Sequence, residues 1–382
     1  MTLKLTEEQV MLRDSIRRMV EKHVAPLVPS MEETDRFPEE LVPIFGDMGL
    51  LQLWLPEEYD GPGGDLKTVC IAKEEIAKVS LAAATLCANN SISFILPLLH
   101  YGTEAQKKRW LPLAAQGRLV TSIGITEPQS GSDVSSIRTR AVRDGDHWVV
   151  NGQKSWITWG GNAHWLLLFA KTSDAGGSNG ISAFMVDTKT PGFRLGRKEL
   201  KMGRHGSPSH ELFFENMRVP ADCMIGAEGE GFKACMKVLD LNRPTIAATS
   251  LGLAQGALDV AVKYAKERTQ FGKPIAQFQG MQFKLADMAI QIEAARTLLY
   301  SCADEIDSGD HSRLNMISSI TKCFVTDVAM AVTIEAVQVL GSYGYSKDFP
   351  VERMMRDAKL NQIIEGTNEI HRLIVARRLL EA

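Results

Sequence analysis

The chain has 382 residues, more than a single hydrophobic core usually serves, so we expect two or three domains. Its 45% hydrophobic and 23% charged residues are typical of a soluble globular protein, and a formal net charge of -3 gives no electrostatic reason to expect nucleic acid. The first residues lack the basic and apolar regions of a signal peptide. No apolar run is expected to reach the length of a membrane span, so we expect no membrane insertion. A cytoplasmic location is expected, or the mitochondrial matrix if the chain is eukaryotic and processed.

Residues 1–120 are predicted to form an N-terminal all-α domain. Thr6 and Gln9 have the spacing of a capping box at the start of the first helix. A loop is indicated where EEYDGPGGD, at 57–65, interrupts the helical pattern. The apolar face of the first helix comprises Leu12, Ile16, Met19 and Val20.

Residues 121–228 are predicted to form a middle β domain. Short segments rich in β-branched and aromatic residues follow one another here, among them HWVVNGQKSWIT, HWLLLFAKT and HELFFENMRVP. Asp144–Gly145 lies between two such segments and is typical of a tight hairpin turn. Strands at this spacing, with no helical stretch between them, favour an antiparallel barrel or sandwich.

Residues 229–382 are predicted to form a C-terminal domain of long helices. One apolar stripe persists from 281 to 299 with a helical period. Gly272 and Pro274 break the pattern, so a loop joins two long helices there. A final helix is expected after Thr367, which can cap it, and Glu369 would complement its N-terminal dipole. The chain is thus mainly α with a β domain in the middle.

Several classes of site find no support in the sequence. The six cysteines are scattered without a CxxC pair, and we expect free thiols in a reducing compartment. The histidines have no metal-ligand spacing, and no metal is expected, although His205 and His210 share a loop-like stretch. No GxSxG elbow, P-loop or strand-linked GxGxxG occurs, so the sites that these motifs build are unsupported.

Other segments could bind a ligand. SIGITEPQSGSD, at 122–133, offers backbone and hydroxyl donors to an anion or a heterocycle, although a polar surface loop is equally compatible. KSWIT places Trp156 and Thr158 on one side of a strand. The indole could stack on a ring there, but core packing is the commoner fate of a strand tryptophan. RTQFG and QVLGSYGY are weaker signals of the same kind.

Glu365 lies in IIEGTN, between two isoleucines and Gly366. The isoleucines favour burial, and a buried carboxylate is costly unless it is paired or protonated. Gly366 removes a side chain where a ligand could approach the backbone. From these residues alone, an ordinary loop-to-helix junction with a half-exposed glutamate is the simpler interpretation.

Taken together, TEPQSGSD, KSWIT, ERTQFGKPIAQFQ, QVLGSYGY, RDAK and IIEGTNEIHR resemble the motifs of the acyl-CoA dehydrogenase family in order and spacing. The resemblance covers essentially the whole chain and is strongest to the short- and medium-chain members. It implies an N-terminal helical domain, a middle antiparallel β-barrel and a C-terminal four-helix bundle. It also implies an FAD-dependent homotetramer of fatty acid metabolism that passes electrons to electron-transferring flavoprotein.

The resemblance assigns the FAD contacts residue by residue. Thr126 would bond the isoalloxazine edge, Trp156 would cover one flavin face, and Arg268 would reach the cofactor of a neighbouring subunit. The implied FAD-binding residues are Ile123, Ile125, Thr126, Ser132, Trp156, Ile157, Thr158, Arg268, Phe271, Gln279, Gln338, Val339, Leu340, Gly341, Ser342, Thr367, Asn368 and Glu369.

The resemblance also implies the reaction. Glu365 matches the base that abstracts the α-proton of an acyl-CoA thioester, while FAD accepts the β-hydride and a trans-2-enoyl-CoA is formed. The backbone N–H of Glu365 would help to stabilise the developing enolate. Substrate contacts are implied for Ser132, Asp240, Arg243 and Gly366.

Departures from the family pattern bear on the mechanism and the acyl group. Some members carry the base on an earlier helix, where this chain has Asn242, and Ser342 replaces a common glycine. Glutaryl-type members place an arginine near the position of Ala83. Without it, and with the bulk of Trp159, we expect a short to medium, uncharged acyl chain. The alternatives are an acyl-CoA oxidase, another flavoenzyme of the same fold with a different reaction outcome, and a scaffold without catalytic activity.

Overall fold

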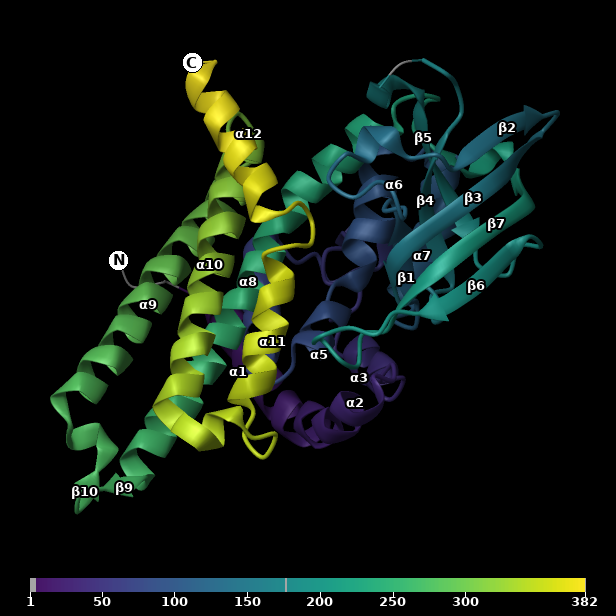
Figure 1. The fold of residues 1–382 in the computed structure, drawn as a ribbon. Coiled ribbons are helices and arrows are strands. Elements are labelled where there is room, and N and C mark those ends of the chain that lie inside the picture. The colour runs from purple at the N-terminus through teal and green to yellow at the C-terminus, as the bar shows by residue number, and fades with distance from the viewer. Residues whose placement is uncertain (1–4, 176, 382) are drawn as a thin grey trace.

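The computed structural model describes residues 5–175 and 177–381. Figure 1 shows a sheet on the right, long C-terminal helices on the left, and the N-terminal helices between and below them. The predicted order of a helical, a β and a second helical part is confirmed.

The N-terminal helices pack around an apolar cluster of their own. The predicted capping box begins α1: Thr6 Oγ1 accepts a hydrogen bond from the Gln9 amide, and Gln9 Oε1 accepts one from the Thr6 amide, both at 3.2 Å. Ile16 and Met19 are buried, as the helical period predicts. The α-helices are α1 (Glu7–Met19), α2 (Val28–Thr34), α3 (Leu41–Asp47), α4 (Leu66–Ala77), α5 (Leu81–Leu86), α6 (Leu96–Tyr101) and α7 (Glu104–Ala115).

The middle part forms a sheet with the strand order β6-β7-β3-β2-β4-β5-β8, and β1 pairs with β4. Gly145, with a φ of 60°, makes the predicted turn between β2 and β3. Most pairs are antiparallel as predicted, but β1 and β2 both pair with β4 in parallel. The strands are β1 (Thr121–Gly124), β2 (Arg140–Asp144), β3 (His147–Thr158), β4 (Trp165–Lys171), β5 (Ile181–Asp187), β6 (Phe193–Lys198), β7 (Ser209–Pro220) and β8 (Met224–Ile225).

In the C-terminal part, α10 packs against α8, α9, α11 and α12. A small hairpin of β9 and β10 joins α8 to α9 at the lower tip of the bundle in Figure 1, where Gly272 and Pro274 predict a loop. At the other end of the bundle, α12 extends beyond its neighbours (Figure 1). The elements are α8 (Gly231–Glu267), β9 (Thr269–Gln270), β10 (Lys273–Pro274), α9 (Gln279–Asp307), α10 (Leu314–Leu340), α11 (Val351–Asn361) and α12 (Asn368–Leu380).

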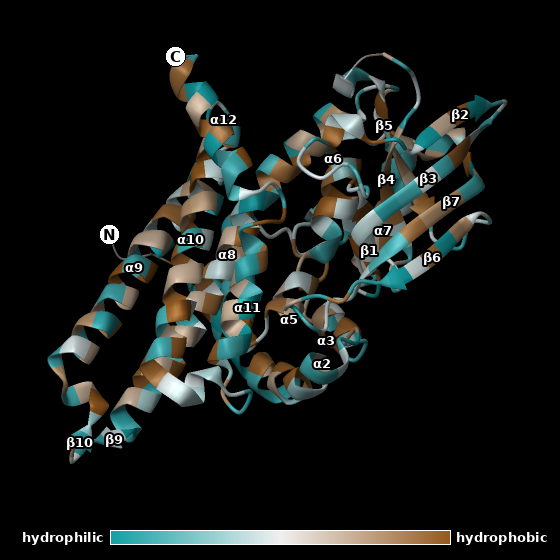
Figure 2. Cartoon of the chain, in the orientation of Figure 1, coloured by the Kyte–Doolittle hydropathy of each residue, from teal (hydrophilic) through white to brown (hydrophobic). Residues whose placement is uncertain are grey.

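Three helical segments are long and apolar enough to cross a membrane by length and composition, so the expectation that no apolar run reaches that length is wrong. They are Leu81–Tyr101, Gly231–Glu267 and Leu314–Tyr345. In the first two, 83% and 78% of the apolar window is buried, so they serve as core helices. In the third only 50% is buried, and hydrophobic residues recur along the bundle helices (Figure 2).

Candidate active site

The connection between α11 and α12 holds Glu365 in an uncommon backbone conformation. Glu365 has a φ of 53° and Gly366 a φ of 95°, both in the left-handed region. Such strain at a non-glycine residue is rare and clusters at functional sites. A Cβ on Gly366 would also lie 3.0 Å from His371 Nε2, so glycine is required here. Thr367 then caps α12 as predicted, accepting a hydrogen bond from the Ile370 amide at 3.3 Å.

Side chains of α8 hold Glu365. Asn242 Nδ2 lies 2.9 Å from Glu365 Oε1 and 3.0 Å from Oε2. Arg243 Nε donates to the backbone carbonyl of Glu365 at 3.4 Å, and Arg243 is itself ion-paired with Asp240. Residue 242, which the sequence marks as the alternative position for a base, therefore touches the carboxylate of the candidate base.

Burial raises the pKa of Glu365 above its ordinary value and is the largest influence on it. The hydrogen bond from Asn242 and the positive charges of Lys73, Arg243 and Lys322 act in the opposite direction. Part of the residue remains accessible, so a ligand can reach it. A fixed carboxylate with a raised pKa accepts a proton more readily than an ordinary glutamate does.

Lys322 and His371 support this loop from α10 and α12, and neither was predicted from the sequence. Lys322, fully buried, donates to the Gly366 carbonyl at 2.8 Å. The ring of His371 is also buried, with Nδ1 3.1 Å from Ser319 Oγ, and burial lowers its pKa to about 3, so it is neutral. The sequence signal for these two residues is a lysine and a histidine at positions of the helices that face inward.

A buried ion pair fixes the segment that follows β1. Lys154 Nζ on β3 lies 2.8 Å from Glu127 Oε1 and donates to the Ile125 carbonyl at 3.0 Å. Glu127 also accepts from the Thr139 amide at 3.0 Å, and these positive and donor partners hold its pKa at about 2. This pair was not predicted, and a lysine within a strand was the only signal that the sequence offered for it.

Trp156 stands out from β3 on an irregular stretch of strand. The register between β3 and β7 shifts between Lys154 and Ile157, and Trp156 has a φ of 63°. Its side chain is 56% exposed, so it is not packed in the core as most strand tryptophans are. By contrast, Trp159 is fully buried and packs edge-on against Phe37 at 5.4 Å, which is a packing role.

A second set of predicted cofactor residues lies at the far end of the bundle, near the β9–β10 hairpin. Phe271 is 93% exposed there, and the Arg268 guanidinium lies 5.7 Å from the ring centre of Tyr343. Between Lys322 and Gln338, α10 rises roughly 24 Å, at about 1.5 Å per residue. One protomer therefore does not bring this set to Glu365. The set comprises Arg268, Phe271, Gln279, Gln338 and Ser342, all exposed.

Several of the predicted contact residues use their side chains inside the protein. Val339, Leu340 and Ile157 are buried among apolar residues, so only their backbone is available to a ligand. Asn368 is also buried and donates to Asp327 at 2.7 Å. Among the others, Ile123, Ile125, Thr126, Thr158 and Thr367 are half-buried, and Ser132, Gly341 and Glu369 are exposed.

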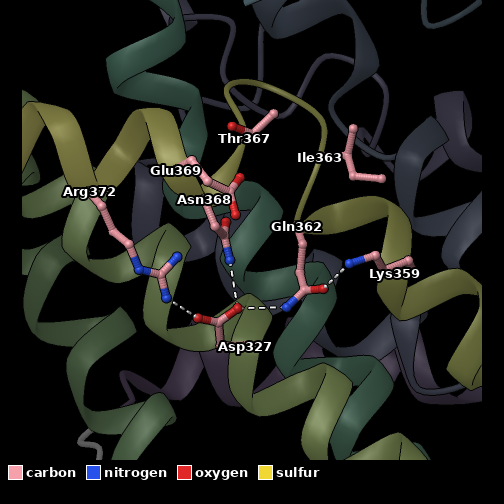
Figure 3. Close-up of a pocket in the computed structure, with 8 residues that line it drawn as sticks. All are labelled: Asp327, Lys359, Gln362, Ile363, Thr367, Asn368, Glu369 and Arg372. Carbon is pink, nitrogen blue, oxygen red and sulfur yellow. Dashed lines mark hydrogen bonds and ion pairs between the residues drawn. The ribbon is translucent and has the colours of Figure 1, made fainter.

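Figure 3 shows a polar cavity of about 310 Å³ beside the start of α12. Thr367 and Glu369, both predicted to contact the cofactor, line it. Ile363, which the sequence predicts to be buried, is instead 50% exposed and lines the same cavity. Backbone amides at a helix N-terminus can meet an anion in such a position. Asp327 accepts hydrogen bonds from Gln362 at 2.6 Å, Asn368 at 2.7 Å and Arg372 at 2.7 Å.

Three family models match nearly the whole chain. The N-terminal domain of acyl-CoA dehydrogenase matches residues 6–118, the middle domain 122–217 and the C-terminal domain 229–380. A probable acyl-CoA dehydrogenase of Mycobacterium tuberculosis is 48% identical over 378 residues, which cover 99% of this chain and 96% of the relative.

Solved structures agree with these matches over the full length. Butyryl-CoA dehydrogenase from Megasphaera elsdenii superposes with a TM-score of 0.95 at 41% identity, covering 100% of both chains. A chain from a study of the electron transferring flavoprotein of Acidaminococcus fermentans has a TM-score of 0.95 at 43% identity, again covering 100% of both. The residues around Glu365 thus lie in a fold that this chain shares over its whole length with acyl-CoA dehydrogenases. This chain belongs to the acyl-CoA dehydrogenase family of flavoprotein oxidoreductases.

Proposed function

We propose that this chain catalyses the FAD-dependent α,β-dehydrogenation of an acyl-CoA thioester to the trans-2-enoyl-CoA, with Glu365 as the base. The observation that carries the proposal is the Glu365 carboxylate, which has a raised pKa and is held by Asn242 in a strained loop. An α-proton beside a thioester is only weakly acidic, so its removal needs a base held close to it in a site that excludes water.

The side chains around Trp156 fit a flavin. The exposed indole offers an aromatic face on which a ring can stack. Thr126 is half-buried and fixed to β3 by a hydrogen bond from the Ser155 amide to its carbonyl at 2.9 Å, so its hydroxyl can bond the edge of a heterocycle. Bound FAD would supply the acceptor for the β-hydride.

Glu365 and the residues that hold it would then have distinct roles at the thioester. Glu365 takes the α-proton on its carboxylate, and its backbone N–H can donate to the thioester oxygen, where negative charge develops. Asn242 keeps the carboxylate oriented by donating to its oxygens. Arg243 and Lys322 bind the carbonyls of Glu365 and Gly366 and so hold the backbone in place.

A homotetramer in which neighbouring subunits complete each cofactor site is part of the proposal. Arg268 and Gln338 lie far from Glu365 along the bundle, so a second copy of the chain would have to present them. The bundle also exposes large apolar side chains, a property of surfaces that bind another protein. They include Phe283 (60%), Ile290 (66%), Ile334 (46%) and Leu373 (51%).

Electron-transferring flavoprotein is the proposed electron acceptor. The likeness to a chain from a study of such a flavoprotein in Acidaminococcus fermentans supports this choice. An acyl-CoA oxidase would differ in its reaction with oxygen, so the rate at which oxygen reoxidises the reduced enzyme separates the two possibilities.

The purified protein should be yellow, with non-covalent FAD that mass analysis identifies after denaturation. Anaerobic mixing with a panel of acyl-CoA thioesters should bleach the flavin, and electron-transferring flavoprotein should restore its colour. Absence of flavin after reconstitution, or no bleaching by any thioester, would contradict the proposed function. Fast reoxidation by oxygen would support the oxidase instead.

A further inference from the structure

Two positive side chains near Glu365 are buried without an ion pair. Lys73 of α4 is 5% exposed, and Arg204, in the connection between β6 and β7, is 6% exposed. Neither forms an ion pair with a carboxylate of residues 5–175 or 177–381. Lys73 Nζ makes only a 3.4 Å contact with the Ala84 carbonyl, and Arg204 Nη2 donates to Thr158 Oγ1 at 2.9 Å. Unpaired buried charge is costly, which points to a ligand as the missing partner.

Hydrogen-bond donors in this region lack acceptors. Among the described residues, Arg204 Nε has no partner, and Lys73 uses one of its three donors. The indole nitrogen of Trp159, the residue after Thr158, is likewise buried without an acceptor. Arg204 binds the neighbour of Trp159 and is close enough to Lys73 to lower its pKa, so these donors border one region. A ligand that matches them carries acceptor atoms and negative charge.

The position of Arg204 is enforced by the helix that leads to Glu365. Its φ of 52° is in the left-handed region, and its backbone amide donates to Asp357 Oδ1 of α11 at 2.5 Å. Asp357 in turn faces Arg353 at 3.6 Å, so its carboxylate is shared with another cation. The guanidinium of Arg204 is left directed at Thr158, one of the residues predicted to contact the flavin.

Lys73 and Arg204 both lie within electrostatic range of Glu365. Burial lowers the pKa of both cations, that of Arg204 to about 10, and nearby carboxylates counter it: Asp357 and then Glu365 for Arg204, and Glu365 for Lys73. Arg243 and Lys322 add two more positive charges around the same carboxylate, and of these Arg243 is paired with Asp240. Of these four cations, only Arg243 forms an ion pair with a carboxylate of the described residues.

We propose that Arg204 and Lys73 select acyl-CoA thioesters whose acyl group carries a carboxylate at its far end. This deepens the proposed function and rests on it. A guanidinium with a free Nε can donate to a carboxylate with charge assistance, and an ammonium can share the remaining oxygen. The expectation of a short to medium, uncharged acyl chain rested on the absence of an arginine near Ala83 and on the bulk of Trp159, and Lys73 and Arg204 played no part in it. Lys73 and Arg204 are far apart in sequence, so only the fold reveals that they converge.

The test compares acyl-CoA thioesters of equal length on the FAD-loaded enzyme. Anaerobic flavin reduction is measured with glutaryl-CoA against pentanoyl-CoA, and with pimeloyl-CoA against heptanoyl-CoA. The wild type should favour the carboxylated member of each pair by ~10-fold or more, as expected for hydrogen bonds to a charged group. Arg204→Met and Lys73→Met should remove most of this preference, whereas Arg204→Lys, which keeps the charge, should retain part of it.

A binding measurement separates this proposal from the proposed function. In FAD-loaded Glu365→Gln, which lacks the base, the Kd ratio for glutaryl-CoA and pentanoyl-CoA should show the same preference without turnover. If no thioester bleaches the wild-type flavin but the Kd preference holds, the proposed function fails and the selectivity stands. Equal or tighter binding of pentanoyl-CoA overturns the selectivity. Loss of FAD in Arg204→Met with the preference intact assigns Arg204 to the cofactor and overturns its role here.

Discussion

At position 365 a carboxylate, a left-handed backbone and a glycine neighbour occur together. A left-handed non-glycine residue costs of order 1–3 kcal/mol, and burial of the carboxylate adds to this. Asn242, Arg243 and Lys322 offset these costs by binding the carboxylate and the adjoining carbonyls. These contacts hold the backbone as well as the side chain. The carboxyl group of residue 365 can therefore be replaced while the loop keeps its shape.

Glu365→Gln should therefore abolish turnover while leaving acyl-CoA binding nearly intact. Glutamine has almost the same volume, and its carbonyl oxygen can still accept from Asn242, but it cannot take the α-proton. A positioned base contributes about 10²- to 10⁴-fold, so the rate of flavin reduction should fall by that factor. Stopped-flow absorbance measures this rate, and equilibrium titration measures the acyl-CoA affinity.

Asn242→Glu on the Glu365→Gln background is the control for this prediction. Asn242 Nδ2 lies 2.9 Å from a carboxylate oxygen of Glu365, so a carboxylate at 242 would begin close to the lost one. Partial recovery of flavin reduction is expected. A Glu365→Gln enzyme that reduces its flavin within a few-fold of the wild-type rate would show that another group is the base.

Between elements, the Glu127–Lys154 pair ties the segment after β1 to β3 and so places Thr126 beside Trp156. Both members are almost completely buried. Breaking a buried pair leaves the surviving charge uncompensated, which is more damaging than removing both. The pair is thus a positioning device for the surface on which we expect the flavin to lie.

Lys154→Met should destabilise the protein by about 3–5 kcal/mol and reduce its flavin content, because Glu127 would stay buried without its partner. Urea unfolding and the flavin-to-protein absorbance ratio measure the two effects. Lys189→Met, at an exposed lysine in the turn between β5 and β6, is the control and should change stability by less than about 0.5 kcal/mol. A Lys154→Met protein as stable and as yellow as this control would contradict the assigned role.

The same pair gives a pH dependence with a defined sign. The pKa of Glu127 is lowered from 4.5 to about 2, so its ionised form stabilises the folded protein. That contribution is present above the ordinary carboxyl pKa and is lost as pH falls toward 2. In Lys154→Met, burial of Glu127 without the ammonium raises this pKa, so the loss of stability relative to the wild type should become smaller as pH falls toward 2.

At the scale of the whole molecule, the predicted cofactor residues fall into two groups that one protomer keeps apart. One group lies on β1, β3 and the loop before α12, and the other lies near Arg268 and Gln338 at the far end of the bundle. Only half of the apolar window in the segment that contains α10 is buried. Both features have one explanation if neighbouring copies meet along the bundle and share their cofactor sites.

FAD retention should therefore depend on oligomerisation. Arg268→Ala should weaken FAD binding by ~10-fold or more, as expected for loss of a charged contact, while the fold is unchanged. Lys347→Ala, at an exposed cation of the same end of the bundle, is the matched control. Light scattering and flavin absorbance over a dilution series measure assembly and cofactor content together. A well-folded monomer that keeps stoichiometric FAD would contradict this prediction.

Much of the local structure could be predicted because it depends on neighbours in the sequence. The capping box of Thr6 and Gln9, the turn at Gly145 and the cap at Thr367 all follow from short-range hydrogen bonding and backbone preference. Burial was harder to predict. Ile363 is apolar yet half-exposed, because it borders a polar cavity and does not face the bundle core.

The sequence by itself determined the order of helical and β parts, the family, and the glutamate proposed as the base, since these depend on periodicity and on contiguous motifs. Only the tertiary structure decided which distant residues meet. It paired Glu127 with Lys154, set Asn242 against Glu365, and brought Arg204 to Thr158. The physical reason is that charge, burial and hydrogen bonding at a site depend on distances in space, and residues remote in sequence set those distances.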